Sequence, residues 1–409
     1  MKKIGISSLF IVLVMFFSFT VTASGPDIGG SLEQDIIYDD DTSETIGISK
    51  ISLELKQDYG FDKHLYLNPE FSYTYDENND SSEFVLKEGY LDFYLSDADL
   101  RIGRQFINWG TAYELNPTDM INPIDYTDED PFEASQAVDA ISIKYYLSNN
   151  MELSGVLVGN YVQGEVSESS RKYSFTKTVE TILQKNPNAA VNPIPKIEEE
   201  PEIKGLDDAE YGLNFTKRNF KGYDLSLSYF KGYEDTPTLT TNIVDIIKGR
   251  ESQLVYEYKE TQAVGFNAIG SIGQYGVWSE ANYAFNEDNE KTFDIILGGD
   301  YTFENNLYTV GQLFHRDYND YQLNPDDINY LICYTDKPFR QIHKWEASFI
   351  YDLDNNQYLL NPQLDFSLAN NVKLNFGTVI NSGFSDLADN SLLKMLGKEK
   401  SYLELVYSF

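Results

Sequence analysis

The sequence has few cysteines and few basic residues, and each shortage excludes a class of protein. Its 1 cysteine, Cys333, cannot form an intramolecular disulfide, and a lone cysteine in a strand is more often an apolar filler than a reactive thiol. Lys and Arg total 31 against 65 Asp and Glu, so the net charge is −34. This charge repels nucleic-acid phosphates, and we expect no nucleic-acid partner. It favours cations or neutral solutes, although acidic loops that only aid solubility would give the same balance.

Long hydrophobic runs are also scarce, and the clear one lies at the N-terminus, from Ile4 to Phe19. Its length of about 16 residues is short of the roughly 20 needed to cross a bilayer as a helix. Lys2 and Lys3 precede it and small residues around Ala23 follow it, which is typical of a secretory signal. We predict a signal peptide at 1–23 and a single exported domain at 24–409.

Catalytic and metal-binding patterns are weak. The 3 histidines, His64, His315 and His343, lie in no recognisable nucleophile motif. Calcium-loop starts at Asp76 and Asp352 lack the later Gly and Glu that the motif requires. We predict no catalytic residues, no metal site and no cofactor, and therefore a protein that is not an enzyme.

What the chain does contain is aromatic residues, 31 Tyr and 25 Phe, in segments that alternate with a period of two. Alternation dilutes the apolar signal in this way in membrane barrels, whose lipid-facing and lumen-facing residues alternate. We predict an all-β fold, a transmembrane antiparallel β-barrel of 16 to 18 strands, and favour 18. The expected strands are 26–37, 45–59, 64–75, 83–95, 99–109, 137–148, 151–163, 209–218, 222–233, 251–271, 275–285, 291–303, 307–317, 328–335, 341–353, 357–368, 371–380 and 401–409.

The count of 18 depends on the loops. Barrels of this kind have short periplasmic turns and long extracellular loops. The long connectors all fall on one side if 251–271 is one strand and 328–335 is a strand; without the first and fourteenth strands the number is 16. A barrel of either size leaves an aqueous lumen. The predicted long connectors are 110–136, 164–208, 234–250, 318–327 and 381–400.

The last nine residues, SYLELVYSF, alternate up to the chain end. They resemble the C-terminal strand of Gram-negative outer-membrane β-barrels, which the barrel-assembly machinery reads during insertion. The resemblance implies an outer-membrane location, lipid contact on one face and that machinery as a partner; an ordinary edge strand is the alternative. The proposed assembly signal consists of Leu403, Leu405, Tyr407 and Phe409.

The densest motif is RIGRQFINWGTAYELNPTDMINPIDYTDED, residues 101–130. A strand with Gly-Arg-Gln that ends in Trp-Gly, followed by two Asn-Pro-x-Asp units, resembles poorly characterised Gram-negative porin-like proteins related to alginate-export-type barrels. The resemblance covers about 30 residues closely, and it implies a porin-like fold more strongly than any substrate.

The loop in this motif could narrow a pore. A residue before proline is held extended, so the two Asn-Pro units set a rigid path. Folded inward, the loop would place Glu114, Asp119 and Asp125 in the lumen. Alternatively, the two aspartates cap local turns through backbone N–H groups.

The strand before the loop carries two arginines. Arg101 and Gln105 share the face expected to line the lumen, whereas Arg104 falls on the apolar face, where it would cost roughly 2–4 kcal/mol near mid-membrane. Either a bulge at Gly103 turns Arg104 inward, or Arg104 reaches an interface. An inward Arg101 and Arg104 pair opposite acidic Glu114, Asp119 and Asp125 would form a constriction.

The predicted function is an outer-membrane porin for passive diffusion of small hydrophilic solutes, with a preference for cations. Two alternatives stay open. One is a substrate-specific transport barrel for a saccharide or an organic acid, and the other is a non-conducting structural or adhesion barrel filled by its loops. The porin resemblance leaves a homotrimer open.

Overall fold

The structure is a computed structural model, and most of the chain after residue 24 is described. The predicted signal peptide, 1–23, and most of the connectors 164–208, 242–250 and 383–398 lie outside the described residues. The described residues are 25–39, 44–76, 80–125, 135–148, 150–165, 208–235, 237–241, 251–252, 254–319, 327–382 and 399–409, with residues 179, 183, 190–191, 196–197 and 205.

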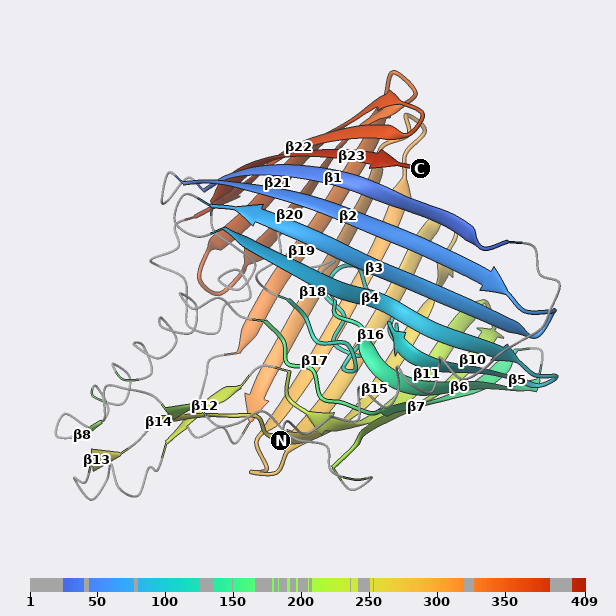
Figure 1. The fold of residues 1–409 in the computed structure, drawn as a ribbon. Helices are drawn as coiled ribbons and strands as arrows, with labels where there is room; N and C mark the ends of the chain where they lie inside the picture. The colour runs from blue at the N-terminus through green and yellow to red at the C-terminus, as the bar shows by residue number, and fades with distance from the viewer. Residues whose placement is uncertain are drawn as a thin grey trace, which may run out of the picture.

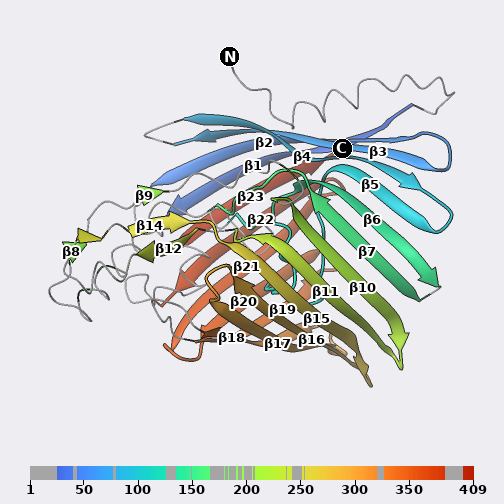
Figure 2. The same ribbon diagram turned by 90° about the horizontal axis from the view of Figure 1, so that it is seen from below.

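Eighteen antiparallel strands form one closed sheet, in which each strand pairs with its neighbours along the chain and the last strand pairs with the first. Figures 1 and 2 show the first strands beside the last ones. The barrel strands are β1 (Asp27–Asp39), β2 (Thr45–Asp58), β3 (Lys63–Tyr75), β4 (Ser81–Tyr94), β5 (Ala98–Gln105), β6 (Val138–Ser148), β7 (Met151–Val158), β10 (Glu210–Phe220), β11 (Tyr223–Tyr233), β15 (Glu260–Ile272), β16 (Tyr275–Asn286), β17 (Lys291–Thr302), β18 (Tyr308–Asn319), β19 (Ile328–Phe339), β20 (His343–Asp352), β21 (Gln357–Ala369), β22 (Val372–Asn381) and β23 (Lys400–Ser408).

The prediction of an 18-stranded barrel is therefore confirmed, including the two weakest strands, which appear as β1 and β19. One boundary differs. The predicted strand 251–271 is divided, because the barrel strand β15 begins at Glu260 and the preceding residues pair in small separate sheets. Those sheets contain β8 (Ala190–Val191), β9 (Lys196–Ile197), β12 (Thr238–Thr241), β13 (Glu251–Ser252) and β14 (Leu254–Glu257).

The pairing register separates two faces, because residues directly opposite each other point to the same side of a sheet. Ile51, Leu32 and Phe71 lie opposite one another on β2, β1 and β3, and all three are exposed on the outer face. Lys50, Glu33 and Ser72 alternate with them on the inner face. An exposed apolar exterior around a closed barrel is suited to lipid, where every backbone group must be paired within the protein. The chain is therefore a multi-pass outer-membrane β-barrel.

The C-terminal strand closes the barrel. In β23, the four residues of the predicted assembly signal lie on the outer face and are exposed, while Glu404 faces inward beside β1. The chain end itself is held, because Phe409 donates its N–H to Gly30 O at 3.0 Å and accepts the N–H of Gly30 at 3.1 Å. In the part of the chain that is described, no helix is long and apolar enough to cross a membrane.

Candidate functional site: a loop inside the barrel

The segment between β5 and β6 does not extend outward from the barrel rim. Residues 106–125, called the inner loop here, run into the lumen and contact strands β15 to β20 on the other side (Figure 1, teal). The sequence expectation of an inward-folding loop therefore agrees with its observed path. The remaining residues of the predicted connector, 126–134, lie outside the described part of the chain.

One carboxylate holds two points of the inner loop. Glu280 on β16 is completely buried, and its Oε1 accepts the backbone N–H groups of Thr111 and Ala112, the latter at 2.6 Å. Its Oε2 accepts the hydroxyl of Thr118 at 3.1 Å. The same hydroxyl lies 2.9 Å from Oδ1 of Asn267 on β15. Hydrogen bonds to an ionised acceptor are about twice as strong as neutral ones, so Glu280 is a strong anchor.

A second polar anchor lies two strands further on. Gln312 on β18 accepts the N–H of Tyr113 at 3.2 Å and donates its Nε2 to Tyr113 O at 2.7 Å. Trp278 Nε1 donates to the same amide oxygen at 3.0 Å, which fixes the orientation of the amide. Glu114 then reaches β20, where Oε1 accepts the hydroxyl of Ser348 at 3.3 Å. These contacts span the lumen from wall to wall.

Apolar contacts add to the polar anchors. Ile107, Trp109 and Ile121 pack in a buried cluster with wall residues of β6, β7, β11, β15 and β16. Ala112, Tyr113 and Leu115 pack against a second cluster on β16 to β22. Burial of one large apolar side chain contributes roughly 1.5–3 kcal/mol. The inner loop is therefore part of the packed interior on this side of the lumen.

The local turns of the inner loop explain its unusual sequence. Gly110 has a φ of 99°, and a Cβ atom there would meet the side chain of Asn116. Asn116 donates its Nδ2 to Trp109 O at 2.8 Å, and Asn122 accepts the N–H of Ile107 at 2.8 Å. The two Asn residues of the Asn-Pro units thus satisfy backbone groups within the loop, a common role of this side chain in turns.

The three predicted acidic residues occupy different environments in the inner loop. Glu114 contacts β20, whereas Asp119 has a buried Oδ1 that lacks a hydrogen-bond partner. Burial, then the charges of Asp235 and Glu280, raise the pKa of Asp119 well above its usual value. Asp125 forms a backbone bridge with Glu165 at the end of the loop. Their role as a pore constriction stays a prediction.

Arg101 lies on the lumen wall, as expected, with its charge already matched. Its Nε and Nη2 donate to the two carboxylate oxygens of Asp92 on β4 at 2.7 and 3.0 Å, and its guanidinium lies 3.6 Å from the ring centre of Tyr90. Gln105 is buried at the root of the inner loop, where it donates to Ala140 O and accepts the hydroxyl of Ser142. Gln105 therefore supports the wall and does not face the bore.

The inward pair of Arg101 and Arg104 requires correction. β5 pairs with β4 and β6 without a register shift, so there is no bulge at Gly103 to turn Arg104 inward. Arg104 lies opposite Gly89 and Asp139 on the outer face, on the side away from Arg101. The absent side chain of Gly89 leaves room for it. The acidic Glu114 also contacts β20, distant from β5 along the sheet, so the structure does not bring these predicted partners together.

The lumen wall away from the loop anchors carries charged side chains in pairs. The cations keep contact with water: Lys56 and Lys87 are 46% and 50% exposed, whereas Ile296, Ile332 and Ile350 on the opposite wall are fully buried. The bore therefore runs along the charged wall. The ion pairs on β1 to β5 are Lys50 with Glu33 and Asp35, Lys56 with Glu54, Lys87 with Glu70, and Arg101 with Asp92.

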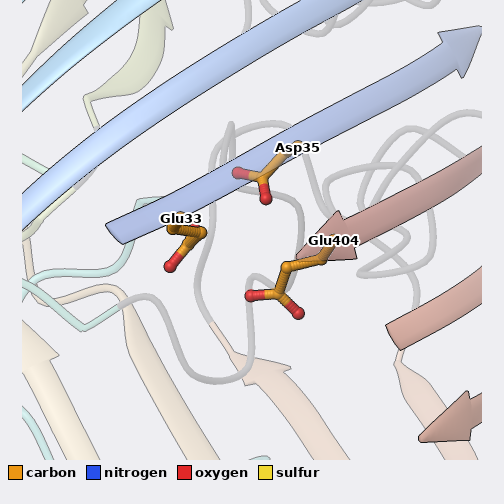
Figure 3. Close-up of side chains that lie close together, drawn as sticks. All are labelled: Glu33, Asp35 and Glu404. Carbon is orange, nitrogen blue, oxygen red and sulfur yellow. The ribbon is translucent and has the colours of Figure 1, made fainter. Parts of the chain in front are cut away.

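One group of carboxylates lies on this wall at the seam between β1 and β23 (Figure 3). Oxygens of Glu33, Asp35 and Glu404 come within 4.8 Å of one another, the spacing needed to bind one metal ion. The ammonium of Lys50 lies 2.7 Å from Glu33 and 3.2 Å from Asp35 and supplies positive charge there. We interpret the group as an ion-pair network.

The residues that hold the inner loop were not found by sequence reasoning. Glu280, Gln312 and Asn267 fall on the inner face of three strands, where polar residues are ordinary in a barrel. Nothing in the pattern distinguishes a residue that binds a loop from one that faces water. Thr118 lies between Pro117 and Asp119 in the motif, and this position was the available signal.

Comparisons with known proteins agree with this architecture. The family model described as "Protein of unknown function (DUF1302)" matches residues 22–385. No curated protein sequence matches the chain.

Similar solved structures are porins of two organisms. OccK5 (OpdH) of Pseudomonas aeruginosa has a TM-score of 0.55 and 9% identity, over 94% of this chain and 97% of that chain. OccAB3 of Acinetobacter baumannii has a TM-score of 0.53 and 10% identity, over 94% and 99%. OpdK of P. aeruginosa, solved with vanillate, has a TM-score of 0.52 and 9% identity, over 94% and 98%. These likenesses show a shared porin fold.

Proposed function

The chain belongs to this family of proteins of unknown function, DUF1302, and we propose that it forms a channel through which small hydrophilic solutes cross the outer membrane. A barrel of 18 strands is wide enough for an aqueous lumen. The observation that carries the proposal is the unequal exposure of the two walls. Charged side chains on β1 to β5 stay in contact with water, while the wall under the inner loop is buried.

The bore is expected to prefer cations. On the charged wall Lys50 is shared between Glu33 and Asp35, so carboxylates are in excess there. The whole chain carries a net charge of −34, which raises the local concentration of cations at the mouth. A charged lumen selects ions by its field, and this effect weakens as salt screens it.

Planar-bilayer recording of the purified protein tests the proposal. We expect single-channel conductance, and in a tenfold KCl gradient a reversal potential of the sign given by K⁺ permeation. The expected preference decreases as total salt rises, since the Debye length falls from about 10 Å at 0.1 M to about 3 Å at 1 M. Absence of conductance from folded protein would contradict the channel, and anion selectivity would contradict the charge assignment alone.

A second candidate is substrate-specific uptake. The inner loop is fixed by polar and apolar contacts, so it narrows the lumen to a defined shape and not to a flexible gap. OpdK, which shares the fold, was solved with vanillate. A specific channel would show flux that saturates with solute concentration and conductance that the solute blocks. Linear flux of saccharides and organic acids would favour general diffusion.

A further inference from the structure

The wall beneath the inner loop is shaped to receive it. On β10, a Cβ atom at Gly212 would collide with the indole ring of Trp109 and approach Ile121 at 3.1 Å. On β15, a Cβ atom at Gly265 would lie 3.0 Å from Cγ2 of Thr118. Both strands therefore lack a side chain where the loop comes closest. Such complementarity indicates one seated position of the loop.

Glu280 lies at the centre of this seat. It is fully buried, and its carboxylate receives hydrogen bonds from three donors that are contributed by both ends of the loop segment 111–118. Without it, the N–H groups of Thr111 and Ala112 would lose their printed acceptor, and a buried unpaired backbone group is costly. The apolar contacts alone do not orient the loop, because dispersion contacts are not directional.

We propose that Glu280 is the positioning residue that sets the bore of the channel. It holds the inner loop against β15 to β18, so that solute passes on the side of β1 to β5. When this carboxylate is lost, the segment 111–118 leaves its seat and the lumen widens toward β16. The inference rests on the proposed channel function and adds the residue that controls the size limit.

The first test is the substitution Glu280→Ala, with Glu280→Gln as the conservative variant. We expect Glu280→Ala to raise the single-channel conductance about twofold and to admit larger neutral polyethylene glycols, since conductance follows the open cross-section. Glu280→Gln keeps one carbonyl oxygen for the two backbone donors and should stay closer to the wild type. Neutral polymers separate a change in size from a change in charge.

The matched control is Glu70→Ala. Glu70 is another inner-face carboxylate with a largely buried side chain, but its partners are Lys87 and Ser52 on the charged wall and not the inner loop. Its loss is expected to change the reversal potential while leaving the polymer size limit unchanged. Folding of each variant is checked by the shift of the unheated barrel on a denaturing gel.

A disulfide provides the reverse experiment. The ideal Cβ position at Gly265 lies 3.3 Å from Cβ of Thr118, close to the roughly 3.5–4.5 Å that a disulfide needs. We would introduce Thr118→Cys and Gly265→Cys, with Ser228→Ala for space and Cys333→Ser to remove the native thiol. In the Glu280→Ala background, the oxidised protein should recover the wild-type size limit, and reduction should abolish this recovery.

The outcomes separate the two proposals. If the wild type conducts and Glu280→Ala keeps its size limit, the role of Glu280 is overturned while the channel stands. If folded wild-type protein does not conduct, both fail. If Glu280→Ala does not fold, Thr118→Val removes one of the three donors from the other side, and its size limit must rise for the proposal to survive.

Discussion

Asp35 on β1 and Glu404 on β23 lie directly opposite each other across the seam that closes the barrel. Like charges in directly opposed positions destabilise a sheet. Lys50 on β2 lies between this pair and Glu33, with its ammonium 3.2 Å from Asp35 and 2.7 Å from Glu33. The closure of the barrel therefore depends on a cation supplied by the next strand along.

Replacing Lys50 with Met should weaken this closure. Asp35 is only 5% exposed, so its carboxylate would lose a charged partner at a site with little water. We expect a loss of about 1.5–3 kcal/mol in the free energy of unfolding, the usual range for a hydrogen bond to a charged group. Urea unfolding of the refolded protein, followed by Trp fluorescence, measures it.

The control for that substitution is Lys56→Met on the same strand. Lys56 pairs with Glu54, and both side chains are more than 40% exposed. Exposed ion pairs contribute roughly 0–1 kcal/mol, so this loss should be smaller. Equal losses for the two variants would show that the seam has no special dependence on Lys50.

The C-terminal aromatic residue is expected to matter for assembly. Phe409 forms two backbone hydrogen bonds with Gly30, and its ring lies over the open position of that glycine, where a Cβ atom would be 2.9 Å from Cζ. We expect Phe409→Ala to lower the amount of folded protein in the outer membrane severalfold. Ser408→Ala, on the inner face beside it, is the control and should assemble normally. Heat-shift gels of membrane fractions give the comparison.

Arg101 and Arg104 should differ in their effect on ion flow. Arg101→Ala would leave Asp92 without its bidentate partner in the lumen, so the reversal potential should shift further toward K⁺. Arg104→Ala, on the outer face, should leave the reversal potential unchanged. A shift of similar size for both would mean that Arg104 also faces the bore.

The outer end of the inner loop should loosen as pH rises. Asp235 follows β11, and its backbone oxygen accepts the N–H of Gly164 at 2.7 Å. Burial, then the charges of Glu210 and Glu234, raise the pKa of Asp235 from 3.8 to about 8. Because the folded state binds this proton more tightly than the unfolded state, local stability is greatest below about pH 4 and decreases as pH rises to about 8.

Hydrogen exchange measures this effect. Peptides that cover 119–125 and 159–165 should exchange faster at pH 9 than at pH 6 after correction for the intrinsic rate. Asp235→Asn mimics the protonated side chain and should remove the difference. A difference that persists in Asp235→Asn would assign the pH dependence to other groups, of which Asp119 is the first to test.

The strands of the barrel could be predicted because their signal is local. Each of Leu403, Leu405 and Tyr407 faces lipid for a reason that nearby residues reveal, namely alternation with a period of two. Loop parity then required 18 strands, and a closed sheet with both ends on one side allows no odd number. The division of 251–271 was missed because the pattern of β14 continues into β15 without a turn residue.

The inner loop could be anticipated in part. Two Asn-Pro units indicated a rigid path, and the asparagines do satisfy local backbone groups. The partners of the loop could not be predicted, since Glu280 is about 160 residues away from Thr118 in the chain, a separation that only barrel closure brings together. The side of Arg104 was also undecided, because alternation and a glycine bulge predict opposite faces.

Export, the barrel and its orientation in the membrane thus follow from the order of residues, because hydrophobic period, turn chemistry and terminal signals are all short-range. Which wall is covered and which wall lines the bore was decided by the tertiary structure. That choice depends on Glu280, Gln312, Gly212 and Gly265, residues on four separate strands. Their contacts exist only after the sheet has closed, when one carboxylate and two missing side chains hold the inner loop to one side of the lumen.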